Sequence, residues 1–128
     1  MKREAEQIAR QWLDEVSFSA ATWNLEAHMQ LVSRQVKVTG IPNINSIDYT
    51  GWERRRKNEF EKKLLRSLNY RLLDILEGKE EQLYFTVEET MRANNGKSVI
   101  IEKEVKLHRE DDGKWRVRRE HIKRIRKQ

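Results

Sequence analysis

The spacing of apolar residues along the chain changes once, at about residue 66. Before that point apolar residues recur every three or four positions, which is typical of helices that bury one face. After it they alternate with polar residues, which is typical of strands that bury one face. Because helices and strands are segregated, the pattern predicts an α+β fold rather than alternating α/β units.

The first half predicts three helices and one short strand. The first helix spans roughly four turns, with an apolar stripe made of Ala5, Ile8, Ala9, Trp12, Leu13 and Val16. Either Thr22 or Asn24 caps a second, shorter helix, whose apolar side carries Leu25, His28, Met29 and Val32. The segment VKVTG then predicts a strand that ends at Gly40 and Pro42.

A third helix is predicted from the segment TGWE to about Leu65. Thr50 and Glu53 have the three-residue spacing of a capping box. The buried side of this helix is expected to carry Trp52, Phe60 and Leu64.

Four strands follow, and they are SLNYRLLDIL, QLYFTVEETM, SVIIEKEVKLH and KWRVRREHIKRI. The segments between them, EGKEE, ANNG and EDDG, have the composition of tight turns. We therefore expect an antiparallel meander. A chain of 128 residues suits one domain, so residues 1–128 are treated as a single unit.

The turn at ANNG decides which side chains face inward. A three-residue turn, Asn94 to Gly96, pairs Val87 with Lys103 and puts two apolar rows on one side. A two-residue turn would set an apolar row against a charged one, so the longer turn is favoured. The inward rows are then Leu83, Phe85, Val87, Glu89 and Met91; Val99, Ile101, Lys103, Val105 and Leu107; and Trp115, Val117, Arg119 and His121.

This register places four ionisable residues near one end of an apolar surface, namely Glu89, Lys103, Arg119 and His121. Apolar walls with a few converging polar groups are typical of a small-ligand pocket. A lone buried charge is unfavourable, so Glu89 is expected to pair with Lys103 or Arg119. His121 could then act as a general acid or base near neutral pH. The alternative is a structural ion-pair network that binds nothing.

The net charge of +6 is concentrated at the C-terminal end. Residues 114–127 hold eight Lys or Arg and one Glu, or +7, which leaves −1 for the remainder. Such patches attract anions and nucleic acids. However, the basic residues alternate with apolar ones as in a strand, and only Arg124, Arg126 and Lys127 resemble a free arm. Nonspecific nucleic-acid binding is therefore the least favoured hypothesis.

Several classes of site lack the residues they need. The chain has no Cys, and its histidines, at positions 28, 108 and 121, lack the spacing of zinc ligands. It has no glycine-rich phosphate loop and no Ser–His–Asp pattern. We expect no cofactor and no metal. The polar start MKREAEQIAR and the lack of a long apolar run predict a cytoplasmic protein without membrane contact.

Several segments resemble the nuclear transport factor 2-like superfamily, which includes ketosteroid isomerases, polyketide cyclase-like proteins, scytalone dehydratase and limonene epoxide hydrolase. WNLEAHMQLVSRQVKVTG is similar to its second helix and first strand, YTGWERRRKNEF to its third helix, and GKWRVRREH to its closing strand with a G-x-W-x-V pattern. The resemblance is one of pattern over nearly the whole chain. It implies a bent sheet wrapped around the helices into a cone, with a pocket at the open end.

The resemblance also suggests which aromatic residues line that pocket. Trp12 lies on the first helix, and Tyr49 and Trp52 flank a loop expected at the mouth of the cone. His28 lies on the apolar side of the second helix, where a core histidine is more common than a ligand-binding one. We include these four residues as candidates for the pocket wall.

The reactions of the superfamily do not transfer. Ketosteroid isomerases place a carboxylate at the end of the first strand, where this chain has Thr39 and Gly40. Their first-helix tyrosine falls near Trp12, which has no hydroxyl. The Asp–Arg–Asp set of an epoxide hydrolase and the paired histidines of the dehydratase are also missing, and a fold alone does not fix a function.

Two hypotheses rank above nucleic-acid binding. In the first, the pocket binds an apolar or anionic small molecule, or acts on it as a metal-free isomerase or dehydratase-like lyase. Lys103 and Arg119 would then hold the anionic group while His121 and Glu89 move the proton. In the second, the chain is a non-catalytic interaction domain that forms a homodimer or docks another protein through the outer face of its sheet. On that face acidic residues of one strand lie opposite basic residues of the next.

Overall fold

The structure, a computed structural model, describes residues 2–128. The helices are α1 (Lys2–Ala21), α2 (Leu25–Met29) and α3 (Tyr49–Glu61). The strands are β1 (Val32–Thr39), β2 (Leu65–Gly78), β3 (Gln82–Ala93), β4 (Ser98–Arg109) and β5 (Trp115–Lys127). The predicted order of elements and the α+β class are confirmed. No helix in residues 2–128 is long and apolar enough to cross a membrane.

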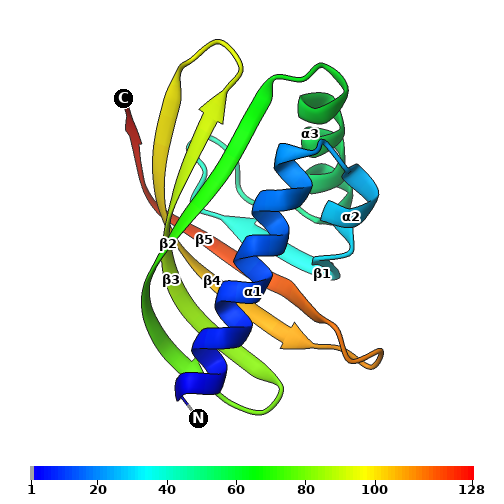
Figure 1. The fold of residues 1–128 in the computed structure, drawn as a ribbon, viewed down its shortest axis with the longest axis vertical. Helices are drawn as coiled ribbons and strands as arrows, with labels where there is room; N and C mark the ends of the chain where they lie inside the picture. The colour runs from blue at the N-terminus through cyan, green and yellow to red at the C-terminus, as the bar shows by residue number, and fades with distance from the viewer. Residues whose placement is uncertain (1) are drawn as a thin grey trace.

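The five strands form one sheet in the order β1-β5-β4-β3-β2. The strands β2 to β5 are an antiparallel meander, and β1 joins its end parallel to β5. The sheet is strongly curled but not closed, and α1 runs lengthwise across its concave side while α2 and α3 lie beside β1 (Figure 1). This is the cone that the resemblance to the nuclear transport factor 2-like superfamily implies.

The core lies between α1 and the inner face of the sheet. The predicted stripe of α1 is confirmed, since its residues are buried except for the half-buried Ile8. They pack against a sheet face whose centre is Phe85, Val105 and Val117, all fully buried. Each large apolar side chain buried in this way stabilises the fold by about 1.5–3 kcal/mol.

The short helix α2 begins where one of the two predicted caps lies. The side chain of Asn24 accepts a hydrogen bond from the backbone N–H of Ala27, so Asn24 and not Thr22 is the N-cap. The helix ends at Met29, three residues before Val32, which is the first residue of β1. The placement of Val32 on the helix was therefore wrong, because this β-branched residue starts a strand.

The helix α3 differs from its prediction at both ends. Its N-cap is Asp48, whose Oδ1 accepts from the backbone N–H of Gly51 at 2.9 Å, and not Thr50. It ends at Glu61 because Lys63 adopts a left-handed conformation with φ of 52°. Leu64 consequently lies outside the helix and is half exposed instead of buried.

The turn between β3 and β4 is the predicted three-residue turn. Ala93 and Lys97 close it with a backbone hydrogen bond, and Val87 is paired with Lys103. Gly96 occupies the left-handed position of the turn with φ of +90°. The inner rows of β3 and β4 are therefore assigned correctly.

The last strand contains two β-bulges that strict alternation does not allow. Lys106 pairs with Arg119 while the neighbouring Leu107 pairs with Val117, so Arg118 is an extra residue. Beyond it the alternation shifts by one position. A second bulge, at Lys123, lies between the pairs formed by Glu102 and Lys103.

The first bulge overturns part of the predicted inner face. Glu120 and Ile122, expected on the outside, face inward, whereas Arg119 and His121 are exposed on the outer face. The strand also continues to Lys127, which pairs with Val99. The predicted basic arm at residues 124–127 is thus part of the sheet, because β4 supplies backbone partners for its whole length.

Gly40 lets the chain turn sharply after β1. Its φ is +90°, and a Cβ atom at this position would lie 2.1 Å from the backbone oxygen of Ile122 on β5. A side chain cannot fit there without separating the two strands. Gly96 has the same φ, but a Cβ there would meet no atom within 4 Å.

These two glycines form a matched pair for a stability measurement. We expect Gly96→Ala to cost about 1–2 kcal/mol, the strain of a left-handed alanine. Gly40→Ala should cost about 3 kcal/mol or more, because the clash with Ile122 adds to that strain. Urea unfolding followed by circular dichroism measures both, and equal losses would contradict the close approach of β1 and β5.

Candidate functional site

A cavity of about 250 Å³ lies between α3 and the inner face of β3, β4 and β5. Most of its wall is apolar and consists of Val38, Ile41, Ile47, Trp52, Met91, Ile101, Ile122 and Ile125. Six charged residues complete it, and they are Arg55, Arg56, Glu59, Glu89, Lys103 and Glu120. This combination of apolar wall and converging charges is what a small-molecule site requires.

Three of these charges form a nearly buried cluster across three neighbouring strands. The Nζ atom of Lys103 on β4 lies 2.8 Å from Oε2 of Glu89 on β3 and 2.9 Å from Oε1 of Glu120 on β5. The exposed fractions of Lys103, Glu89 and Glu120 are 5%, 1% and 5%. The hydroxyl of Tyr70 donates to Oε2 of Glu89 at 2.5 Å. The predicted pair of Glu89 and Lys103 is therefore present, with Glu120 as a third member.

The protonation states in the cluster follow from its contacts. Burial alone would raise the pKa of Glu89, but Lys103, Arg56 and the hydrogen bonds from Lys103 and Tyr70 outweigh it and lower that pKa. Burial would likewise lower the pKa of Lys103, yet the carboxylates of Glu120 and Glu89 raise it. Burial, followed by the charge of Glu89, raises the pKa of Tyr70 well above its usual value. Glu89 and Lys103 are therefore charged at neutral pH, and Tyr70 is a neutral donor.

A second polar group, centred on His28, lies behind the wall of the cavity. Its Nε2 accepts from Nε1 of Trp52 at 3.1 Å and from Nε of Arg56 at 3.2 Å. The proton must then be on Nδ1, which donates to the Oγ of Ser19 at 3.0 Å. Burial, and next the charges of Arg56 and Lys103, lower the pKa of His28 well below its usual value. His28 is thus a neutral acceptor that fixes Trp52 and Arg56.

The charges near α3 are arranged differently from the deep cluster. Arg56 pairs with Glu59 at 2.7 Å, and Arg55 is exposed at the edge of the cavity without an ion pair among residues 2–128. The wall as a whole is balanced, with three cations and three carboxylates. The deep cluster, formed by Glu89, Lys103 and Glu120, has one cation and two carboxylates and therefore a net charge of −1. A bound head group would therefore meet an excess of acceptors there.

The predicted site residues divide into three groups. Trp52, Glu89 and Lys103 line the cavity, and His28 supports it from behind. Arg119 and His121 lie on the opposite face of the sheet, because the bulge at Arg118 turns them outward. The expected inward placement of those two residues was wrong.

The remaining two candidates, Trp12 and Tyr49, are not in the wall of this cavity. The ring of Tyr49 stacks beneath the guanidinium of Arg34, whose Cζ is 4.7 Å from the ring centre. Trp12 is buried against the sheet and donates from Nε1 to the backbone oxygen of Leu31 at 3.1 Å. Both residues therefore serve packing around the site.

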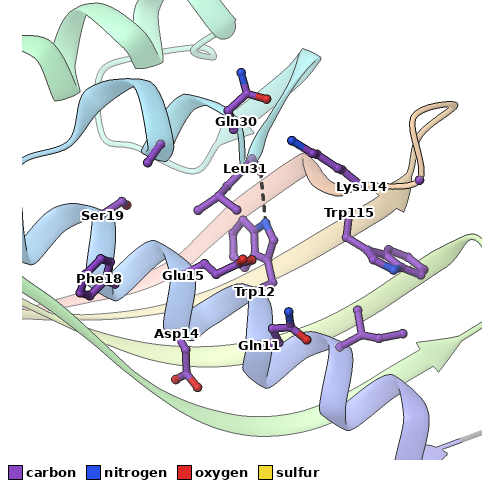
Figure 2. Close-up of a pocket in the computed structure, with 13 residues that line it drawn as sticks. Gln11, Trp12, Asp14, Glu15, Phe18, Ser19, Gln30, Leu31, Lys114 and Trp115 are labelled. Carbon is purple, nitrogen blue, oxygen red and sulfur yellow. Dashed lines mark hydrogen bonds between the residues drawn. The ribbon is translucent and has the colours of Figure 1, made fainter.

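Trp12 lines a larger hollow on the other side of α1, of about 800 Å³. Figure 2 shows this groove between α1, the segment at Gln30 and Leu31, and the turn before Trp115. Phe18 stands at its edge with 72% of its surface exposed. Its charged residues, Asp14, Glu15 and Lys114, are all exposed. Because no charge is buried there, we place the candidate site in the smaller cavity.

Sequence reasoning missed Arg56 and Glu120 as site residues. Arg56 lies four positions after Trp52 and so shares its helix face, but in the sequence it stands in a run of four basic residues, 54–57, that is typical of a solvated surface. Glu120 was assigned to the outer face. A signal did exist, since Val117 and Ile122 are five positions apart and cannot share a face without a bulge.

Comparisons with solved structures identify the fold. A conserved protein from Planctomyces limnophilus superimposes with a TM-score of 0.82 at 10% identity, covering 98% of this chain and 99% of that chain. A nuclear transport factor 2-like protein from Shewanella oneidensis gives a TM-score of 0.76 at 13% identity, covering 91% and 97%. The chain has the nuclear transport factor 2-like fold.

A third structure with this fold is a proposed scytalone dehydratase from Novosphingobium aromaticivorans. Its TM-score is 0.67 at 13% identity, and the match covers 96% of this chain and 83% of that chain. No family model and no curated protein matches the sequence. Identities this low establish the architecture of the nuclear transport factor 2-like fold and transfer no chemistry.

The buried cluster makes a prediction about stability. Lys103→Met would leave Glu89 and Glu120 buried without their cation, so we expect a loss of about 3–5 kcal/mol at pH 7. Without Lys103 the folded-state pKa of these carboxyls should rise above the unfolded value. In the variant, the protonated carboxyls then stabilise the folded state at low pH, and this stabilisation is lost as pH rises. The wild type behaves in the reverse way, because its Glu89 has a lowered pKa and stabilises the folded state at higher pH. Urea unfolding at pH 7 and pH 4.5 should show the difference between the proteins narrowing at the lower pH.

Two further variants control this measurement. Lys97→Met removes an exposed lysine from a turn and should change stability by less than about 0.5 kcal/mol. The triple variant Lys103→Met, Glu89→Gln, Glu120→Gln removes all three charges and should recover much of the loss. A loss for Lys103→Met that is the same at both pH values would argue against the cluster.

Proposed function

We propose that this protein binds a small, largely apolar molecule in the cavity between α3 and the sheet. The observation that carries the proposal is the cluster of three nearly buried charges in an otherwise apolar wall. Apolar residues of similar size would stabilise such a position at least as well as an ion pair does. The cluster is therefore better explained by recognition of a ligand than by stability alone.

The contacts of the cluster favour a particular head group. Oε2 of Glu89 already accepts from Tyr70 and Lys103, whereas Glu120 contacts only Lys103 within the cluster. Glu120 thus keeps acceptor capacity that faces the cavity. A hydroxyl or an ammonium group would complement this site and its charge of −1. A carboxylate would be repelled by Glu120 and would have to turn toward Arg55 and Arg56 instead.

If the bound molecule is also transformed, proton transfer is the chemistry that these residues support. Glu120 would remove a proton from the ligand, and the ammonium of Lys103 would stabilise the negative charge that develops. Glu89 would position Lys103. Because His121 lies on the other face, it has no part in this step.

Three ligands that share one ring system test the proposed head group. We expect 2-naphthol and 2-naphthylmethylammonium to bind more tightly than 2-naphthoate, measured by isothermal titration calorimetry at pH 7. Glu120→Gln should weaken binding of the ammonium compound by about tenfold or more, since a hydrogen bond to a charged group is worth about 1.5–3 kcal/mol. Glu102→Gln, a partly exposed glutamate on β4, should leave all affinities unchanged.

A cavity-filling variant locates the binding. Ile101→Trp places a larger side chain in the cavity wall and should remove binding of all three compounds, provided its circular dichroism spectrum and melting curve show a folded protein. Failure of the wild type to bind any of the three, or unchanged binding by the folded Ile101→Trp variant, would refute the proposal.

Assembly into a homodimer through the outer side of the sheet is a second proposal. It is supported by Leu73 and Leu76, which are exposed on the edge strand β2 at two of its three bulges. Exposed leucines at a sheet edge are unfavourable in contact with water and are typical of a surface that contacts a partner. The strand β2 also carries Arg71, which pairs with Glu88 on the neighbouring strand at 3.3 Å.

Sedimentation equilibrium tests the dimer. We expect twice the chain mass of 15.5 kDa at micromolar concentration, and a shift toward the single mass in the Leu73→Glu, Leu76→Glu double variant. Phe18→Glu changes an exposed apolar residue on α1 and should leave the mass unchanged. A wild-type mass of one chain would rule out this assembly.

A further inference from the structure

Three cations lie directly opposite one another on the outer face of the sheet. In the register of the strands, Lys37 on β1 is paired with Arg119 on β5, and Arg119 is paired with Lys106 on β4. All three side chains are exposed. Like charges at directly opposed positions destabilise a sheet. The arrangement therefore costs stability unless something compensates the charge.

No carboxylate within residues 2–128 forms an ion pair with any member of this cationic row. Other basic residues of β5 do have such partners. Arg116 and Arg118 both contact Glu110, and Arg126 contacts Glu88. Arg119 thus differs from Arg116, Arg118 and Arg126, and among the unpaired basic residues of β5 only Arg119 lies directly opposite two other cations.

The cationic row lines a shared hollow of about 190 Å³. Its wall also contains Thr39 and His121, whose Oγ1 and Nδ1 atoms are hydrogen-bonded at 2.8 Å, and Tyr84. Lys106 makes a cation–π contact with Tyr84, since its Nζ lies over the ring at 4.9 Å from the ring centre. The hollow therefore offers a hydroxyl and an imidazole beside the cations, as a site for an oxyanion would.

The charge of the hollow selects the kind of anion. Glu104 offsets one of the three positive charges, and burial, then a hydrogen bond to Glu104, raises the pKa of Tyr84. Glu120 also borders the hollow, but its carboxylate is paired with Lys103 on the inner face. An excess of two positive charges remains. That excess matches a doubly charged oxyanion better than a single carboxylate.

We propose that this hollow binds a phosphate group, either as free phosphate or as the phosphate of a small monoester. Arg119 sits at the centre of the row and contributes a planar guanidinium suited to two phosphate oxygens. Lys37 and Lys106 flank it from the neighbouring strands. This site is on the opposite face of the sheet from the cavity beside α3 and does not depend on the function proposed for that cavity.

Calorimetric titration of the whole protein with inorganic phosphate and with phenyl phosphate tests the site. We expect saturable binding that weakens as the salt concentration is raised. Tighter binding of inorganic phosphate would indicate free phosphate as the ligand, and tighter binding of phenyl phosphate would indicate a monoester. Arg119→Gln should weaken binding by about tenfold or more, because it removes charged hydrogen bonds. Arg124→Gln removes the same charge from the same strand outside the hollow and should change the affinity less than twofold.

Charge reversal separates the proposal from an ordinary solvated surface. Arg119→Glu places a carboxylate between Lys37 and Lys106, so phosphate binding should vanish while the melting temperature in phosphate-free buffer rises. Phosphate should raise the melting temperature of the wild type but not of this variant. The proposal is overturned if neither phosphate compound binds the wild type, if only an oligonucleotide binds, or if Arg124→Gln and Arg119→Gln weaken binding equally.

Discussion

The bulge at Arg118 shifts the alternation of β5 by one residue, and the chemistry of both sheet faces depends on that shift. With it, Glu120 turns inward to share Lys103 with Glu89, and Arg119 turns outward to stand between Lys37 and Lys106. Since side chains alternate strictly between bulges, one extra backbone residue is enough to exchange the side chains of the two faces. The bulges of β2 and β5 also contribute to the curl of the sheet around α1, because bulges increase local twist and bend the strand.

Electrostatics inside the cavity are organised in two layers. The deep layer is the cluster around Lys103, in which burial opposes the charges of Glu89 and Lys103 and close contacts outweigh burial. The outer layer is Arg56, held by neutral His28 and by Glu59. His28 is kept neutral chiefly by burial, so it supplies an acceptor without adding a charge. The cavity therefore presents fixed dipoles and charges before any ligand arrives, which limits the reorganisation that binding requires.

Much of this architecture could be predicted from periodicity. The stripe on α1 and the three-residue turn at Gly96 follow from spacing, and they correctly place Glu89 and Lys103 on the inner face. The predictions that were wrong concerned local backbone features. The end of α3 depends on the left-handed conformation of Lys63, and the inner face of β5 depends on its bulges. Neither feature produces a periodic pattern of apolar residues. The apolar residues of β5 did indicate the bulges. Val117, Ile122 and Ile125 are separated by odd intervals, so they can share one face only if the strand contains extra residues.

The two bulges of β5 also change which kind of mutation matters most in this strand. A substitution at Arg118 alters one side chain that pairs with Glu110. Deleting the same residue would remove the bulge and keep the faces, because Arg119 would then follow Val117 on the outer side and Glu120 would stay inside. Pairing the same sequence without a bulge would instead bring Arg119 and His121 to the inner face and remove Glu120 from the cavity. The strand thus holds two alternative sets of side chains in one sequence, and the presence of the bulge at Arg118 selects between them. The way β5 pairs with β4, more than the identity of any single side chain, therefore decides what each face of the sheet presents.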